Sequence, residues 1–225
     1  MKTFFQLFLT AALFLSCIGS TNAQNNSEGI INYKIELIGM PKEALSMMEG
    51  ASAKLSFTKD FSRLDIDMVM VNQAYIVKHS DKSTILLMDI MGSKTAVKMT
   101  EKEAKEAKNK GKEAPKYKVE KTKETKEIAG FKCVKAIIKT KGAEPQIVYY
   151  TNEINIPNQI SDEYKEIDGF PLEYTIDQGG MKMKMLATGF KAEKINSKTF
   201  EVLAEYKIMS LEDFKKKMSS FGGGE

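Results

Sequence analysis

Histidine is almost absent from this sequence, and its scarcity limits the available chemistry. His79 is the single histidine among 225 residues, whereas nucleophile–base catalysis most often uses histidine as the proton acceptor. A site fragment formed by His79 and Asp81 is one interpretation, but no nucleophile motif accompanies the pair. A histidine in a surface turn is the preferred interpretation. We therefore expect no catalytic residue and no enzymatic activity.

The residue patterns that hold metals and phosphates are missing as well. A zinc site needs several histidine or cysteine ligands, and the sequence has two cysteines in all. The stretch "DQGGMK" lacks the glycine spacing of a phosphate-binding loop. Asp65 and Asp67 share one face of a predicted strand, but no loop supplies further oxygen ligands, so solvent-facing carboxylates are expected. No cofactor is predicted.

Long hydrophobic runs are confined to the N-terminus. Lys2 precedes the apolar stretch "FFQLFLTAALFLS", which has the length of an export signal and is short for a membrane span. Thr21 and Ala23 place small residues before Gln24, which predicts a signal peptide over residues 1–23. The alternative is an outer-membrane lipoprotein anchored through Cys17, although the bulky Phe14 and Leu15 fit the lipidation box poorly. Either way, an exported periplasmic or secreted protein is expected.

Both cleavage alternatives leave Cys133 as the only free thiol, so no intramolecular disulfide is expected. Cys133 lies in "KEIAGFKCVKAIIKTKG", which reads as a turn at Ala129-Gly130 followed by a strand. Strict alternation places Cys133 on the mixed face of that strand, opposite the cleaner apolar face of Val134, Ala136 and Ile138, unless a bulge shifts the register. A buried structural thiol is preferred over a reactive one.

The remaining chain, residues 24–225, suits a single β-rich domain. The charges are mixed, with 34 basic and 30 acidic residues, which argues against a nucleic-acid-binding surface. Most of the chain alternates polar and apolar residues, as in half-buried strands. Turn residues separate the strands without long helices between them, which predicts an antiparallel meander. The predicted strands cover 29–38, 52–60, 62–70, 74–79, 83–91, 94–99, 132–140, 146–151, 171–176, 181–190 and 199–208.

Two short amphipathic helices are predicted beside these strands. One covers 41–50, with Pro41 at its first position and Gly50 at its end. The other covers 210–218 and begins with Ser210 and Asp213 in capping-box spacing. A flexible tail is expected over 219–225. A charged excursion at about 100–127 has few large apolar residues, and an exposed helix is predicted before Gly111, with a charged edge strand from Tyr117 onward.

A methionine stripe is the most distinctive signal. In "MKMKM", Met181, Met183 and Met185 project from one face of a strand while two lysines project from the other. Thioethers bind Cu(I), so these three residues are the candidate ligands of a soft-metal site. Methionine also fills cores and lines adaptable apolar cavities, and the sequence holds 14 methionines in all. Core or cavity lining is therefore the preferred interpretation.

Four short signatures in order carry a family resemblance: "EGIINYKIEL", "KEIAGFKCVKAIIK", "YYTNEI" and "IDGFPLEYTI". With them the chain resembles the domain-of-unknown-function family 4412, exported proteins common in Bacteroidetes-type bacteria. Such proteins look similar in architecture to the LolA/LolB lipoprotein carriers and to LppX-like lipid binders. The resemblance implies a single strongly curved antiparallel sheet, an open half-barrel, with the two helices plugging its concave side. It brings no catalytic residues.

The function expected from these observations is a non-enzymatic envelope protein that binds a lipid or another apolar small molecule in a hollow lined by methionine and phenylalanine. Peripheral association with an envelope membrane is compatible with this expectation, and the oligomeric state is left open. The alternatives are a periplasmic Cu(I)-binding protein and a structural or protein-interaction module of the envelope. The candidate cavity-lining residues are Met48, Met68, Met70, Met181, Met183, Met185 and Phe214.

Overall fold

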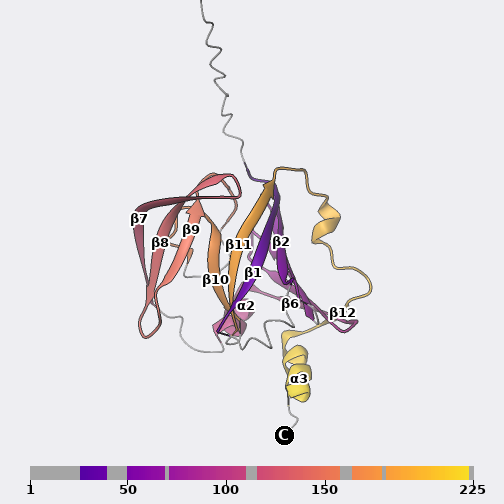
Figure 1. Ribbon diagram of the computed structural model, residues 1–225. Helices are drawn as coiled ribbons and strands as arrows, with labels where there is room; N and C mark the ends of the chain where they lie inside the picture. Colours follow the sequence, from indigo (N-terminus) through magenta and orange to yellow (C-terminus); the bar gives the residue numbers. More distant parts are fainter. Residues whose placement is uncertain are drawn as a thin grey trace, which may run out of the picture.

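The computed structural model describes residues 26–39, 50–68, 71–109, 116–157, 164–178 and 181–222. One sheet of twelve strands dominates this part of the chain (Figure 1). The strand order is β12-β6-β5-β4-β3-β2-β1-β11-β10-β9-β8-β7, and every pairing is antiparallel except the parallel pair of β12 and β6. The strands are β1 (Gly29–Ile38), β2 (Ser52–Phe57), β3 (Phe61–Asp67), β4 (Val71–Lys78), β5 (Thr84–Ile90), β6 (Ser93–Met99), β7 (Tyr117–Ile128), β8 (Phe131–Thr140), β9 (Gln146–Thr151), β10 (Phe170–Gln178), β11 (Met181–Lys191) and β12 (Lys207–Met209).

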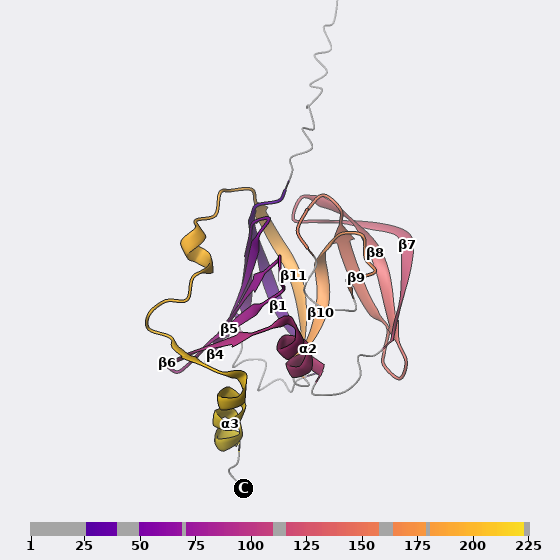
Figure 2. The same cartoon turned by 180° about the vertical axis from the view of Figure 1, so that it is seen from behind.

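The sheet curls strongly, as predicted. It consists of two meanders, β1 to β6 and β7 to β11, that meet where β1 pairs with β11. Figure 2 shows β4, β5 and β6 on one side and β7, β8 and β9 on the other, with β1, β10 and β11 between them. The expectation of an open half-barrel made from one antiparallel sheet is confirmed.

Two hairpins turn through two-residue loops with left-handed backbone. Met91 and Gly92 have φ angles of 50° and 88°, and Ala129 and Gly130 have φ angles of 52° and 83°. Positive φ at both loop positions is the mark of a type I′ turn, whose twist matches the flanking strands. The glycine takes the second position at no steric cost, which explains why the strands end where the sequence places "MG" and "AG".

The buried side of β8 changes along the strand. Phe131 and Cys133 are buried in its first part, whereas Ala136 and Ile138 are buried in its second part. The change lies opposite an irregularity of β7, where Lys121 and Thr125 face residues only two apart on β8. The irregularity lies in β7, and β8 itself pairs with β9 without a register shift. Cys133 therefore keeps the face that strict alternation predicts, opposite Ala136, and it is fully buried there.

The middle of the concave side is filled by the connection between β9 and β10. Its residues Ile154, Ile156, Tyr164 and Ile167 are buried in the main core together with inward-facing residues of β1, β2, β10 and β11. The predicted helix over 41–50 lies outside the described residues apart from Gly50. Among the described residues, apolar side chains of this connection join the core on the concave side.

Two helices lie at one end of the sheet. α2 (Glu101–Asn109) forms within the charged excursion, and β7 begins at Tyr117 as the predicted charged edge strand. α3 (Leu211–Gly222) replaces the first part of the predicted tail. The predicted capping box closes its N-terminus, because the Asp213 amide donates to Ser210 Oγ at 3.1 Å. Both helices contact β6, and no helix in the described part is long and apolar enough to cross a membrane.

The predicted strand over 199–208 is wrong for most of its length. The chain forms a short 3-10 helix, η2 (Ser197–Phe200), then turns, and only Lys207–Met209 pair as β12. We call residues 195–206 the strap. We call the four strands β3 to β6 the wing. The strap lies against the outer face of the wing, the face turned away from the concave side, where Phe200 stacks on Phe61 at 5.5 Å between ring centroids. Its alternating pattern therefore packs against a sheet face instead of extending the sheet.

Candidate functional site

The two faces of the wing formed by β3, β4, β5 and β6 differ completely in charge. Paired residues of adjacent strands share a face, and the pairing Leu64–Tyr75–Leu86–Val97 runs along the concave, inner side. No charged residue lies on this inner face of the four strands. The inner residues are Ser62, Leu64, Ile66, Val71, Gln73, Tyr75, Val77, Thr84, Leu86, Met88, Ile90, Ser93, Thr95, Val97 and Met99.

The outer face of the same strands is charged and largely covered. It carries Arg63, Asp65, Asp67, Lys78, Asp89, Lys94 and Lys98 around a small apolar centre. That centre is covered by Phe200, Val202 and Tyr206 of the strap. Arg63 fixes the strap through a 2.9 Å hydrogen bond from Nη1 to the Thr199 carbonyl and pairs with Asp65. Asp65 is thus engaged by an arginine.

Part of the inner face stays incompletely covered. Direct cross-strand pairs join Val71 to Ile90 and Tyr75 to Leu86. We call the apolar residues of β4 and β5 on this face the inner strip, and all of them are half-buried, unlike the core residues beside them. The inner strip consists of Val71, Tyr75, Val77, Leu86, Met88 and Ile90.

Covered elements flank the inner strip on both sides. On the β6 side, Thr95, Val97 and Met99 are buried near α2 and α3, and Lys217 of α3 donates to Thr95 Oγ1 at 3.3 Å. On the β3 side, Leu64 and Ile66 join the main core. The second predicted helix therefore covers the edge of the concave side and leaves the inner strip between itself and the core.

The polar groups on the inner face are neutral hydrogen-bonding groups. Tyr75 Oη donates to Gln73 Oε1 at 3.0 Å, and Thr84 and Thr95 add hydroxyls. The strands contribute no charge to this face, and the Lys217 ammonium of α3 reaches only Thr95 at its β6 edge. The centre of the face therefore suits a ligand whose bound part is uncharged, because an ion placed there would lose hydration.

The predicted cavity-lining methionines that the structure describes lie in or against the main core. Met183 and Met185 are 1% and 0% exposed, and both lie on the inner face of β11. Met185 pairs with Ile35 on one side and with Tyr174 on the other. Met68 is half-buried against the same core. Met183 and Met185 are therefore core residues.

The other predicted residues are not brought to this site. Phe214 is half-buried on α3, outside both described core clusters. Met48, Met70 and the side chain of Met181 lie outside the described residues. The structure instead adds residues of the inner strip that the cavity prediction omitted, chiefly Tyr75, Leu86 and Ile90. Their alternation was visible in the sequence, but nothing in it showed that this face would stay less covered than its neighbours.

Three tyrosines occupy the filled half of the concave side. Tyr174 makes edge-to-face contacts with Tyr33 at 5.9 Å and with Tyr164 at 5.7 Å. Tyr164 Oη donates to the Thr175 carbonyl at 2.5 Å, whereas Tyr33 Oη is buried without a hydrogen-bond partner of good geometry among the described residues. Burial raises the pKa of Tyr33, and the neighbouring Tyr174 raises it further. The Tyr33 hydroxyl therefore stays neutral at ordinary pH.

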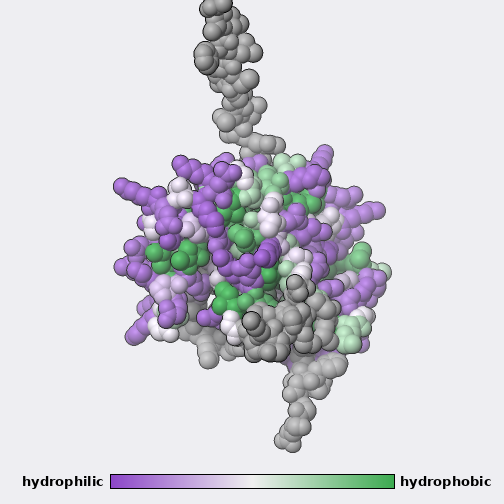
Figure 3. All heavy atoms as spheres, viewed as in Figure 1, coloured by the Kyte–Doolittle hydropathy of each residue, from purple (hydrophilic) through white to green (hydrophobic). Residues whose placement is uncertain are grey.

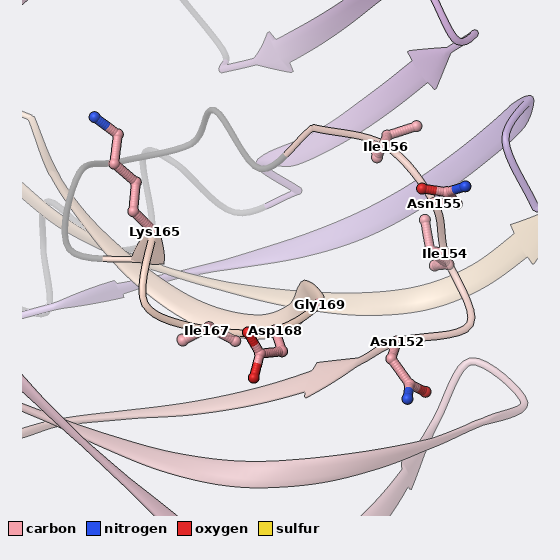
Figure 4. Close-up of a pocket in the computed structure, with 8 residues that line it drawn as sticks. All are labelled: Asn152, Ile154, Asn155, Ile156, Lys165, Ile167, Asp168 and Gly169. Carbon is pink, nitrogen blue, oxygen red and sulfur yellow. The ribbon is translucent and has the colours of Figure 1, made fainter.

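Two surface hollows lie away from the inner strip. One, of about 440 Å³, is formed by the two limbs of the β9–β10 connection, 152–156 and 165–169, which face each other in Figure 4. Asp168 in this hollow pairs with Lys121. The other hollow, of about 500 Å³, spans polar residues of β1, β2 and β3 such as Lys34, Lys54 and Asp67. Neither hollow includes the predicted methionines.

The candidate catalytic and metal-binding residues have structural partners. His79 Nδ1 lies 2.9 Å from the Lys59 carbonyl oxygen. Asp81 accepts hydrogen bonds from Ser83 and pairs with Lys78, which lower the pKa of Asp81 to about 2. Within the described ranges, no three His, Cys, Asp or Glu side chains gather in a group that could hold a metal ion.

Comparison with known proteins gives no family. No family model matches the chain, and no curated protein matches it. A solved structure, the crystal structure of an uncharacterized conserved protein from Thermus thermophilus, is similar with a TM-score of 0.45 and 7% sequence identity. The match covers 84% of this chain and 94% of that chain. The resemblance to the domain-of-unknown-function family 4412 stays a prediction.

Proposed function

We propose that the protein is a non-enzymatic, exported envelope protein that binds an apolar ligand, such as an acyl chain, against the inner strip. The observation that carries the proposal is the inner face of β3–β6, which has no charged residue and whose central apolar side chains stay half-buried. Export is supported by the predicted signal peptide at residues 1–23.

The size of the inner strip suits an acyl chain. It spans four alternate positions on β4, where Gln73 lies between Val71 and Tyr75, and three on β5, and alternate residues of a strand are about 6.6 Å apart. Burial of about ten methylenes would contribute about 8 kcal/mol at ~0.8 kcal/mol each, before the cost of ordering the ligand. Micromolar binding corresponds to about 8 kcal/mol, so weak, reversible binding is the expected regime.

Thioether coordination of Cu(I) finds less support. Met183 and Met185 are buried. Their cross-strand neighbours are Leu37, Ile35 and Tyr174. Both side chains therefore fill the core. A copper ion would have to displace this packing, which fills the space as in other protein interiors.

The test is extraction of the protein purified from its native membrane environment. A fluorescent long-chain fatty acid should bind the natural protein at micromolar concentrations, and mass spectrometry of the organic extract should show enrichment of an apolar molecule, with much less of both for Met88→Asp, which places a charge in the inner strip. Ile147→Asp is the matched control, because Ile147 is an exposed apolar residue on β9 in the second meander. Circular dichroism shows whether each variant is folded.

Absence of an apolar molecule from the natural protein, together with no binding of a fluorescent long-chain fatty acid, contradicts the proposal. An equal loss of the bound apolar molecule in Met88→Asp and Ile147→Asp contradicts the assignment of the binding site to the inner strip.

A further inference from the structure

Lys217 lies on the less exposed side of α3. The side chains of Leu211, Phe214 and Lys217 are half-buried, whereas residues 212–213 and 215–216 are exposed. A spacing of three places Lys217 next to Phe214 on the helix surface. The side of α3 that is partly covered by the rest of the molecule therefore includes a lysine beside its apolar residues.

The ammonium group of Lys217 is held on the inner face of the wing. It donates a hydrogen bond to Thr95 Oγ1 at 3.3 Å, and Thr95 of β6 is 4% exposed. Thr95 lies directly opposite Met88 of the inner strip, and the Cβ atoms of such a pair are about 5 Å apart. A positive charge thus lies one strand away from half-buried apolar side chains, on a face to which strands β3 to β6 contribute no charge.

This pair of side chains can bind an oxyanion. An ammonium group has three N–H donors, and a hydroxyl that accepts one hydrogen bond can still donate another. Lys217 and Thr95 can therefore direct an N–H and an O–H toward the same oxygen or toward two oxygens of one group. Charge-assisted hydrogen bonds of this kind are shorter and stronger than neutral ones.

The surroundings of the pair are compatible with an anion. Glu101 and Glu103 of α2 are engaged, the first with two lysines and the second with the residue that caps the helix. Both follow the end of β6, which is four residues, or about 13 Å, along the strand from Thr95. At the start of β6, Ser93 is exposed. A charged group beside Thr95 would thus lie away from the first turn of α2 and near solvent.

Surface lysines alone would not indicate such a site. The chain has 34 basic residues, and the face of the molecule seen in Figure 3 is largely hydrophilic. Lys217 differs because its ammonium group contacts a buried hydroxyl that adjoins uncharged, half-buried apolar side chains. A cation beside an apolar surface is the combination that suits an amphiphile with an anionic head.

We propose that the acyl ligand of the inner strip ends in an oxyanion, a carboxylate or a phosphate, which Lys217 and Thr95 bind at the β6 edge while the chain lies over Met88. The inference rests on the proposed function, because it names the class of ligand that the inner strip accepts. It also makes α3 part of the binding site.

A fluorescent long-chain fatty acid and its methyl ester separate the head group from the chain, because the acid alone is charged at about pH 7.5. We expect the natural protein to bind the acid about five- to tenfold more tightly than the ester. Lys217→Met keeps the apolar stem of the side chain, and it should abolish this preference without changing the affinity for the ester. Lys217→Arg should retain the preference.

Lys215→Met is the matched control, because it removes the same charge from an exposed position of the same helix. It should leave the preference for the acid unchanged, whereas Thr95→Val should reduce it about two- to threefold. Competition by an alkyl phosphate and by a fatty acid of equal chain length shows which oxyanion binds better. Thermal melts show whether each variant is folded.

Two results overturn the inference and leave the proposed function intact. One is equal affinity of the natural protein for the acid and the ester, which needs no variant to detect. The other is an equal loss of the preference in Lys217→Met and Lys215→Met, because the general charge of α3 then attracts the acid. Failure of both probes to bind the natural protein contradicts the proposed function and this inference together.

Discussion

The ammonium group of Lys126 on β7 lies 2.6 Å from the carboxylate of Glu173 on β10, although β8 and β9 separate these two strands in the sheet. The bulged edge strand therefore curls back far enough to contact a strand three places away. Lys184 on β11 holds the other carboxylate oxygen at 2.8 Å, and Lys126 also lies over the Tyr149 ring. Glu173 connects the two ends of the second meander.

Replacing Glu173 with glutamine should destabilise the fold. The carboxylate is 7% exposed and faces two ammonium groups, and hydrogen bonds to charged groups are worth about 1.5–3 kcal/mol. We expect Glu173→Gln to lower the free energy of unfolding by about 1–3 kcal/mol in urea melts. Glu120→Gln is the control, because Glu120 makes a single exposed pair with Lys139. Equal effects of the two substitutions would contradict a special role for Glu173.

The same group should make stability depend on pH. Burial alone raises the pKa of Glu173, but the hydrogen bonds from Lys126 and Lys184 outweigh it, and the net pKa is lowered. The stabilisation is therefore complete above the unfolded-state pKa of about 4.3 and is lost as pH falls through the lower folded-state pKa. Urea melts of the natural protein and Glu173→Gln should converge as the pH falls below about 4. A constant difference down to about pH 2 would rule this out.

Cys133 should be unreactive in the folded protein. Burial raises the pKa of the Cys133 thiol to about 11, and its Sγ atom contacts the Phe131 carbonyl oxygen at 3.6 Å in a fully buried position. Because the thiolate is the reactive form, we expect negligible labelling by an aromatic disulfide reagent at about pH 8. Guanidinium should release one reactive thiol per mature chain, and rapid labelling before unfolding would show that Cys133 is accessible.

Truncation of Met185 and of Met88 to alanine should lower the free energy of unfolding by different amounts. Met185 is fully buried in the main core, whereas Met88 is half-buried in the inner strip. Met185→Ala should cost about 2–5 kcal/mol, and Met88→Ala should cost about 1 kcal/mol because less apolar surface leaves water on folding. Chemical denaturation of both variants measures the difference. A larger cost at Met88 would place the packed core in the wing instead.

The two tyrosine hydroxyls offer a matched pair. Tyr164→Phe removes a hydrogen bond to the Thr175 carbonyl and leaves that oxygen with one partner fewer, so it should cost about 1 kcal/mol. Tyr33→Phe removes a buried hydroxyl without a well-formed hydrogen bond, so the free energy of unfolding should stay unchanged or rise. Thermal melts of the two variants test this, and a clear loss in Tyr33→Phe would reveal a partner for its hydroxyl.

Alternation in the sequence was a good guide wherever one strand face is buried. The predicted strand over 29–38 coincides with β1, and the predicted edge strand from Tyr117 coincides with the start of β7. Alternation failed at 199–208, because a strap packed on a sheet face can bury every second residue just as a strand does. The bounds of α3 also moved, since the helix continues to Gly222 beyond the predicted end.

The local sequence pattern could not predict which parts of the concave side are covered and which stay partly exposed. Ile154 and Ile156 show a single step of alternation and Ile167 belongs to no periodic run, and all three are buried in the core formed by distant strands. The residues of the inner strip show the opposite behaviour: they follow a strand period, yet they are only half-buried. Val77 and Leu86 alternate like core residues, and their partial exposure depends on how far the β9–β10 connection and the two helices extend over the wing.

The pairing of β1 with β11 has a consequence for how the chain folds. Each meander is built from hairpins between sequence neighbours, whereas β1 and β11 join residues about 150 positions apart, for example Ile35 and Met185. Local hairpins form quickly, while closing so long a loop carries a larger entropy cost. The two meanders should therefore assemble first and the seam between them last. Pulsed amide exchange during refolding should protect β4 and β5 before β1 and β11.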